Sequence, residues 1–267
     1  PFGSNDSPFP DDLWAWLEKT ESEIDARFIA IPHNSNISRG TMFSSETMRG
    51  NKINEGYAES RMRWEPIVEI TQIKGDSETH PDLSPDDRFA NFEKYPWWIL
   101  RDPVNHYNAT KADFIRPALR TGLEIEHEVG VNPFRFGLIG STDSHTSLAS
   151  AEEPNFWGKM AFDSVPDRKQ EPALSEGPTG WSMQAGGLAA VWANENSRAA
   201  ILDGFKRRET YATTGPRIIL RVFAGFGFTD GDLKSENFAA KGYAGGVPMG
   251  GLLTAKDDKT NPVFLIK

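Results

Sequence analysis

The sequence predicts an α/β protein: a parallel sheet or barrel over residues 1–216, followed by a β-rich module over residues 217–267. Two patterns predict this division. In the first part, single short apolar runs alternate with stretches in which apolar residues have the spacing of a helix, and this alternation is typical of parallel sheets and barrels. After residue 217, short alternating runs lie between glycine-rich stretches, which indicates antiparallel strands. Two loop-rich excursions, at about 77–105 and 146–187, interrupt the first part.

The first helices and strands are predicted from capping residues and apolar spacing. Residues 10–12, a proline and two aspartates, precede an apolar stretch and predict the start of an amphipathic helix. Residues 28–32 predict a short buried strand. A helix is expected over about 54–63 and a second short strand over 66–70. Glu69 is then a charged residue inside a strand.

The later elements follow in the same way. Asp113 is expected to cap a helix that runs to about Val129 and ends at Gly130. Residues 136–140 predict a third apolar strand. Further along, Ser197 is expected to cap a helix over 198–208, and a strand is expected over 217–223.

Composition excludes several functional classes. The net charge is -9 and the five histidines are scattered, so there is no basic stripe for nucleic acid. No run approaches the roughly 18 apolar residues of a membrane span. Because the chain has no cysteine, a metal site must use histidine and carboxylates. We therefore expect a small-molecule substrate, with neither nucleic acid nor a membrane span.

Both ends of the chain look cut. It starts at Pro1 without a methionine or a signal peptide, and it stops at Lys267 in what is expected to be a strand. We therefore expect the missing N-terminal and C-terminal parts of the same polypeptide to be partners of this chain. Part of the active site is expected to lie in them.

Two strand ends carry residues that suit a metal ion. Asp143 and His145 come directly after the strand 136–140, and residues i and i+2 of an extended chain project to the same face. His33 lies just beyond the strand 28–32. The alternative is that Asp143 caps a turn and that the histidines are structural. Together the three residues predict ligation of zinc, manganese or iron.

The strand at 66–70 and the loop after it supply further candidates. A buried carboxylate such as Glu69 is costly unless it is paired, so it is either a catalytic residue or the partner of Arg61 or Arg63. Lys74 is expected to hold an anionic substrate group, and Glu78 to act as an acid, base or ligand, with Asp76 and His80 as alternatives in that role. Asn34, Arg39 and Ser141 are the expected substrate-binding residues. No serine-hydrolase elbow or nucleotide-binding glycine motif occurs in a suitable place.

Six segments resemble an uncharacterised bacterial family of unknown function, DUF3604, which is related to the polymerase and histidinol phosphatase (PHP) superfamily. The similarity extends over nearly the whole chain and lies in residues 31–36, 68–78, 137–146, 186–193, 207–215 and 246–250. It implies a distorted (β/α) barrel of PHP type, with two or three divalent ions (zinc, manganese or iron) at its C-terminal rim. His33 corresponds to a mid-chain metal histidine of that superfamily, and Asp143 with His145 to its final pair of ligands. The early H-x-H motif is absent, so the chain resembles a middle portion and the barrel is expected to be partial.

The predicted function is hydrolysis by a metal-dependent enzyme, with phosphoesters as the leading substrate class. One alternative keeps the metal and changes the substrate to an amide, lactone or other ester, because the same centre polarises carbonyl groups. A second alternative is a non-catalytic module that binds a ligand or carbohydrate. The expected location is periplasmic or otherwise extracytoplasmic.

Overall fold

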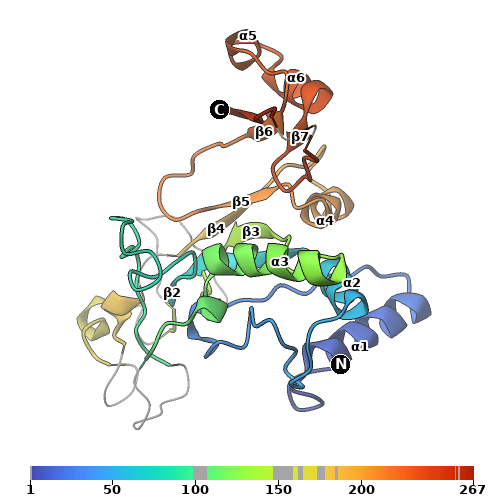
Figure 1. Cartoon of the computed structure of the whole chain (residues 1–267). Helices are drawn as coiled ribbons and strands as arrows, with labels where there is room; N and C mark the ends of the chain where they lie inside the picture. The colour runs from blue at the N-terminus through green and yellow to red at the C-terminus, as the bar shows by residue number, and fades with distance from the viewer. Residues whose placement is uncertain are drawn as a thin grey trace.

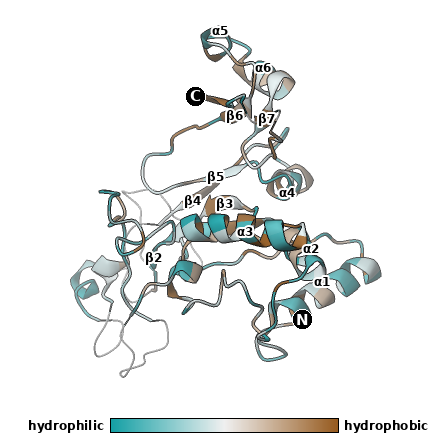
Figure 2. Cartoon of the chain, viewed as in Figure 1, coloured by the Kyte–Doolittle hydropathy of each residue, from teal (hydrophilic) through white to brown (hydrophobic). Residues whose placement is uncertain are grey.

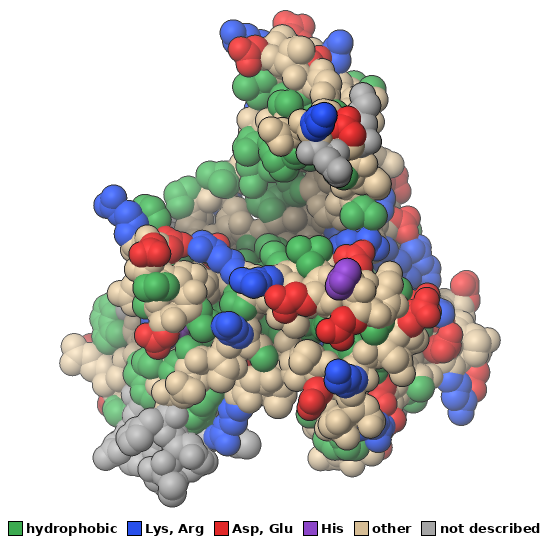
Figure 3. All heavy atoms as spheres, in the orientation of Figure 1, with side chains coloured by type: hydrophobic (Ala, Val, Ile, Leu, Met, Phe, Trp, Pro, Cys, Tyr) green, Lys and Arg blue, Asp and Glu red, His purple; other side chains and the backbone are tan. Residues whose placement is uncertain are grey.

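The computed structural model describes residues 2–98, 107–146, 159–161, 165–172, 178–183, 186–255, 257 and 259–267. Figure 1 shows a larger body that carries the N-terminus and a smaller part that carries the C-terminus. A strand pair and one helix lie between the two. Figure 2 shows hydrophilic and hydrophobic residues alternating along α3, beside a largely hydrophobic β3. Figure 3 shows a hollow between the two parts, with hydrophobic side chains on the side of the C-terminal part.

A small mixed sheet forms the centre of the larger body. Its strands are β1 (Ile67–Gln72), β2 (Gly75–Asp76) and β3 (Gly137–Gly140), in the order β2-β1-β3. β1 and β3 are parallel, with Ile67 opposite Gly137, whereas β2 returns antiparallel to β1. Helix α3 (Ile115–Val129) connects β1 to β3 and ends at Gly130, whose φ of 84° is favourable for glycine.

The main core lies between this sheet and α3. α3 buries one face, and its residues Ile115 and Ala118 pack with Val68 of β1. Phe43 and Phe134 close the same cluster, with ring centroids 5.6 Å apart in an edge-to-face arrangement. The apolar period of α3 is therefore satisfied by one sheet face.

Two N-terminal helices cover the other end of the sheet. α1 (Pro10–Glu23) has proline at its start, and α2 (Glu55–Trp64) is capped by the Asn54 side chain, which accepts a hydrogen bond from the backbone N–H of Tyr57. Trp14 and Leu17 of α1 pack on Trp64 of α2. The predictions of both helices, and of the strand at 66–70, are confirmed.

A strand pair next to β3 joins the two parts of the molecule. β4 (Leu188–Val191) and β5 (Thr210–Thr213) are antiparallel and are connected by α4 (Arg198–Lys206). Ser197 caps α4 as expected, because its hydroxyl accepts from the backbone N–H of Ala200. A Cβ on Gly140 would lie 2.9 Å from the Leu188 backbone N, so glycine allows this close approach.

The C-terminal part is a second small sheet with two helices. β6 (Val222–Gly225) lies between β7 (Val247–Pro248) and β8 (Val263–Ile266), and both neighbours are antiparallel to it. Helices α5 (Asp230–Leu233) and α6 (Phe238–Gly245) connect β6 to β7. Four residues form its core: Phe223, Phe228, Phe238 and Leu265. Short 3-10 turns complete the described structure at Ser35–Ile37, Lys111–Asp113, Pro166–Arg168 and Gly180–Ser182.

The prediction of a distorted (β/α) barrel is wrong. Within the described ranges the strands form three separate sheets of two or three strands, and none of these sheets closes. β1 and β3 are the only parallel pair in those ranges, because β2, β4 and β5 all pair antiparallel. The alternation of apolar runs and helices is a local signal that does not determine how many strands become parallel neighbours. The C-terminal part is also not simply β-rich, since it contains α5 and α6 as well as its three short strands.

Two of the predicted strands differ in detail. Residues 28–32 are half-buried and form no ladder. The prediction of a buried strand there is wrong, because the segment makes only isolated backbone bonds, from Ala30 N–H to the Trp64 carbonyl and from Glu69 N–H to the Pro32 carbonyl. The strand expected at 217–223 begins at Val222. The described part of the chain contains no helix long and apolar enough to cross a membrane.

Asp113 fixes the loop that precedes the central sheet. It is fully buried, and its carboxylate accepts four hydrogen bonds, from Ser38 Oγ, Gly40 N, Thr110 N and Thr110 Oγ1, at 2.6–2.9 Å. The loop contains three residues with positive φ, Asn34, Arg39 and Gly40. Such a backbone persists only where its surroundings hold it. Asp113 therefore joins residues 34–40 to the start of α3, instead of capping α3 as predicted.

We expect Asp113→Ala to lower the free energy of unfolding by about 3 kcal/mol, because two backbone donors lose their partner in a buried position. Urea denaturation measures this. The matched control is Asp232→Ala: Asp232 makes the same pair of bonds to Thr229 at an exposed helix start, so about 1 kcal/mol or less is expected there. Equal losses in the two variants would contradict the special role of Asp113.

Candidate functional site

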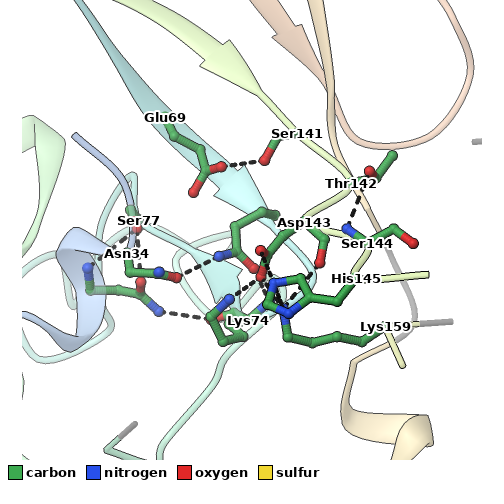
Figure 4. Close-up of polar contacts among 12 residues, drawn as sticks. Asn34, Glu69, Lys74, Ser77, Ser141, Thr142, Asp143, Ser144, His145 and Lys159 are labelled. Carbon is green, nitrogen blue, oxygen red and sulfur yellow. Dashed lines mark hydrogen bonds and ion pairs between the residues drawn. The ribbon is translucent and has the colours of Figure 1, made fainter. Parts of the chain in front are cut away.

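The candidate site lies where β1 and β3 end side by side. Because the two strands are parallel, the segments that follow them leave the sheet at the same edge, which is the usual site edge in α/β proteins. Ser141 N–H continues the pairing by donating to the Thr71 carbonyl at 3.0 Å. Residues 141–146 therefore lie next to the turn that follows β1, as Figure 4 shows.

Lys74 occupies the turn between β1 and β2, and its backbone is held from both sides. Its N–H donates to the Gln72 side-chain oxygen, and Gln72 in turn donates to Asn34 Oδ1. Its carbonyl accepts from Asn36 Nδ2 at 3.0 Å. Gly75 completes the tight turn with a φ of 98°. Only 8% of Lys74 is exposed, so its ammonium group is directed by the fold rather than by solvent.

Four side chains form what we call the charged cluster: Lys74, Asp143, His145 and Lys159. Asp143 contacts each of the other three. Asp143 Oδ2 accepts from Lys74 Nζ and, at 2.5 Å, from Lys159 Nζ. Its Oδ1 lies 3.0 Å from His145 Nε2, which is also 2.9 Å from Lys159 Nζ. Figure 4 shows these groups pointing toward one another. The cluster brings two ammonium groups, one carboxylate and one imidazole together.

The electrostatics of the cluster favour neutral forms of its bases. Burial, together with the positive charge of Lys159, lowers the pKa of Lys74 to about 7. Partial burial and the two lysines also lower the pKa of His145, so its imidazole is neutral at pH 7. A neutral imidazole accepts a proton or a metal ion through its free nitrogen.

Glu69 and Ser141 form a second polar pair beside the cluster. Glu69 is 6% exposed, and its Oε2 accepts a hydrogen bond from Ser141 Oγ. The alternative partners considered for Glu69 are engaged elsewhere: Arg61 pairs with Glu65, and Arg63 pairs with Glu18. The negative charge of Glu69 acts on Lys74 and favours its protonated form. Glu69 is thus a buried charge next to the candidate site.

Other predicted residues lie apart from the cluster in the described structure. His33 is exposed and lines a different cleft. Glu78 forms an ion pair with Arg116 at 2.7 Å. Arg39 is exposed, with its guanidinium 5.1 Å from the ring centroid of Trp98. Asn34 connects to the cluster only through Gln72.

Sequence patterns did not identify Lys159 or Gln72 as site residues. Lys159 is 5% exposed and contacts Asp143 and His145 from 16 and 14 positions away, respectively. It belongs to the excursion at 146–187, where no strand end or motif marked it. Gln72 is the last residue of β1, two positions beyond the end of the strand expected at 66–70, so no sequence pattern marked it.

Asp143 and His145 fit two positions around a metal ion. Neighbouring ligand atoms with bonds near 2.1 Å to one ion are about 3 Å apart. The 3.0 Å between Asp143 Oδ1 and His145 Nε2 agrees with this. Within the described ranges, no group of three or more His, Asp and Glu residues could hold a metal ion. The spacing of Asp143 and His145 is thus compatible with two ligand positions, and the same 3.0 Å also fits a hydrogen bond between them.

Comparison with known proteins identifies the family of this chain but does not assign it an activity. The model of one family, described as Protein of unknown function (DUF3604), matches residues 1–267. No curated protein and no solved structure matches the chain. The match includes every residue of the charged cluster, but the family's description assigns no reaction. Evidence for a function therefore comes from the geometry of the site.

A pH-dependent stability is expected from Asp76 on β2, whose Oδ1 accepts from Glu78 N at 2.7 Å. Burial raises the pKa of Asp76 to about 6 from 3.8. An acid with a raised folded-state pKa is destabilising once it ionises, so this cost appears as pH rises from 3.8 through 6. The Asp76→Asn substitution removes the ionisable carboxyl group and with it this pH-dependent loss of stability. We expect the variant to gain on the order of 2 kcal/mol over wild type between pH 4 and pH 7.

Denaturant unfolding at both pH values measures this gain. Asp82→Asn is the control, because the Asp82 side chain is 75% exposed. A gain of the same size in the control, or none for Asp76→Asn, would contradict the assignment.

Proposed function

We propose that this chain, which belongs to the DUF3604 family of proteins of unknown function, is a metal-dependent hydrolase of phosphoester bonds. The observation that supports this is the charged cluster at the shared end of β1 and β3, where Lys74, Asp143 and Lys159 meet. Buried ammonium groups are costly, and such groups concentrate at functional sites. The resemblance of several segments to the PHP superfamily supports the same reaction class.

The two lysines favour an anionic substrate. The chain has a net charge of -9, so a phosphoryl group needs a local positive charge to bind. Lys74 and Lys159 both contact the Asp143 carboxylate and are directed to the same place at the end of β1 and β3. Protonated lysines bind phosphoryl oxygens as point charges.

Asp143 Oδ1 and His145 Nε2 are the atoms that would hold a divalent ion. Such an ion supplies Lewis-acid chemistry, which polarises the scissile bond and makes water nucleophilic near neutral pH. Asp143 also fixes both lysines through Oδ2. Lys74, with its lowered pKa, holds or accepts a proton at Nζ near neutral pH. Glu69 and Ser141 position the start of the segment 141–146 and keep negative charge near Lys74.

We expect the purified chain, supplied with Mn²⁺ or Zn²⁺, to hydrolyse 4-nitrophenyl phosphate or bis(4-nitrophenyl) phosphate. Asp143→Asn should lower kcat/KM by about 100-fold or more, because both lysines and one metal ligand depend on this carboxylate. Lys159→Met should raise KM about 10-fold through loss of a charge-assisted contact with the substrate. The release of 4-nitrophenolate measures the hydrolysis rates of the wild-type protein and of both variants.

Asp203→Asn and Lys241→Met are matched controls, because they make the same substitutions in exposed ion pairs. Both should retain wild-type rates. Hydrolysis of 4-nitrophenyl acetate without hydrolysis of either phosphate would replace the phosphoester assignment with a carboxyl-ester one. Phosphate hydrolysis that is insensitive to Asp143→Asn would contradict the proposed site.

A further inference from the structure

A cleft of about 570 Å³ lies on the N-terminal side of the larger body, away from the charged cluster. We call it the N-terminal cleft. Residues 2–4 and 7–10 and Leu13 of α1 form one wall, residues 30–33, 41, 42, 46 and 48 form the other, and Tyr57, Arg61 and Glu65 line it from α2 and its end. Its volume is within the range of small-molecule sites, and its walls are mostly apolar, as such sites are.

One wall of the cleft is held rigidly. The Arg49 guanidinium lies 3.9 Å from the ring centroid of Phe9, a residue of the wall. Arg49 is itself fixed by ion pairs with Asp11 at 2.8 Å and Asp12 at 2.6 Å. Cation–π contact and two ion pairs therefore hold Phe9 in place before any ligand arrives. A preformed wall reduces the entropy lost on binding.

The cleft presents two hydrogen-bond donors, whereas Glu65 Oε2, an acceptor of its lining that lacks a hydrogen bond to any described residue, is buried from solvent. Tyr57 lines it, and its hydroxyl makes no hydrogen bond with any residue that the structure describes. Burial raises the pKa of Tyr57, so the hydroxyl keeps its proton. Arg61 donates through Nη2 to the Met42 carbonyl at 2.9 Å and approaches Glu65 through Nε, whereas its Nη1 makes no hydrogen bond within the described ranges. A ligand that fits must accept hydrogen bonds.

Charge restricts the ligand further. The Arg61 guanidinium is already paired with the Glu65 carboxylate, whose nearest oxygen is 3.0 Å from Nε, and both residues are 7% exposed. An anion would therefore be buried beside a neutral pair and near Glu46, which also lines the cleft. A cation would face two donors, Tyr57 and Arg61. Of the carboxylates that line the cleft, Glu65 is paired with Arg61 and Glu46 is exposed to solvent. Burying an unpaired charge of either sign is unfavourable.

The geometry points to a second binding site: the N-terminal cleft binds an uncharged, ring-bearing small molecule that accepts hydrogen bonds from Tyr57 and Arg61. The ring packs between Phe9 and Leu13, and a carbonyl or hydroxyl oxygen meets the two donors. None of the residues that line the cleft belongs to the charged cluster. Binding there does not depend on the hydrolase proposal, and a direct binding measurement tests it separately.

We would titrate the protein with benzamide, benzoate and benzylamine, which share one ring and differ in charge, and obtain each Kd from ligand NMR. Benzamide is expected to bind at least fivefold more tightly than either charged compound. Tyr57→Phe keeps the ring that packs on Trp14, at 4.9 Å between centroids, and removes only the donor. It should weaken benzamide binding about fivefold, the value of one hydrogen bond.

Leu13→Trp fills the cleft and should abolish benzamide binding. Tyr95→Phe and Leu123→Trp repeat the two substitutions outside the cleft and should bind as wild type does. If Leu13→Trp does not fold, Tyr57→Phe decides the question alone. The proposal is overturned if benzamide does not bind, if benzoate or benzylamine binds more tightly, or if Tyr57→Phe leaves the Kd unchanged.

Discussion

The parallel pairing of β1 with β3 is the constraint on which the rest of the structure depends. It sets the edge at which Lys74 and Asp143 leave the sheet, and it requires α3 as the connection between the strands. The pairing is extended beyond β3 by hydrogen bonds from Ser141 to Thr71 and from Gly187 to Ser141. Contact between the backbones of Gly140 and Gly187 is possible because neither carries a side chain: a Cβ on Gly187 would lie 3.0 Å from the Gly140 Cα. The backbone that carries Asp143 is thus fixed by its neighbours on both sides.

Charge compensation explains how two lysines remain buried at that edge. Each ammonium group loses hydration, and the two repel each other, so the arrangement is stable only with the Asp143 carboxylate between them. Glu69 adds negative charge near Lys74, although its oxygen is bonded to Ser141. Burial and the positive charge of Lys159 are the reasons why the pKa of Lys74 falls. Perturbed lysines of this kind concentrate at functional sites, which supports a functional role for this cluster.

Local patterns in the sequence predicted the main helices and the strands at 66–70 and 136–140, because a cap or an apolar period is a property of a few neighbouring residues. Asn54 and Ser197 cap helices as expected, and the strand ends led to Lys74, Asp143 and His145, which meet in the structure. Lys159 could not be found in this way, since it reaches Asp143 from an excursion without periodicity. The barrel prediction was wrong for a related reason: the alternation of elements is equally consistent with a single parallel pair followed by antiparallel hairpins, and only tertiary packing distinguishes them.

The loop at residues 33–40 connects the two candidate sites physically. Asp113 holds it through Ser38 and Gly40, and three residues with positive φ turn the chain within seven positions. As a result, His33 lines the N-terminal cleft while its neighbour Asn34 accepts a hydrogen bond from Gln72, which supports Lys74. Backbone strain of this kind is maintained only where the fold overdetermines it, and it concentrates at functional positions. Arg39 is the residue of this loop for which a positive φ is most costly, and Asp113 holds the backbone on both sides of it through Ser38 and Gly40. The loop contributes Ile37 to a hydrophobic cluster with Ile73 and Tyr95, so it links the packing beside Lys74 to the wall of the N-terminal cleft.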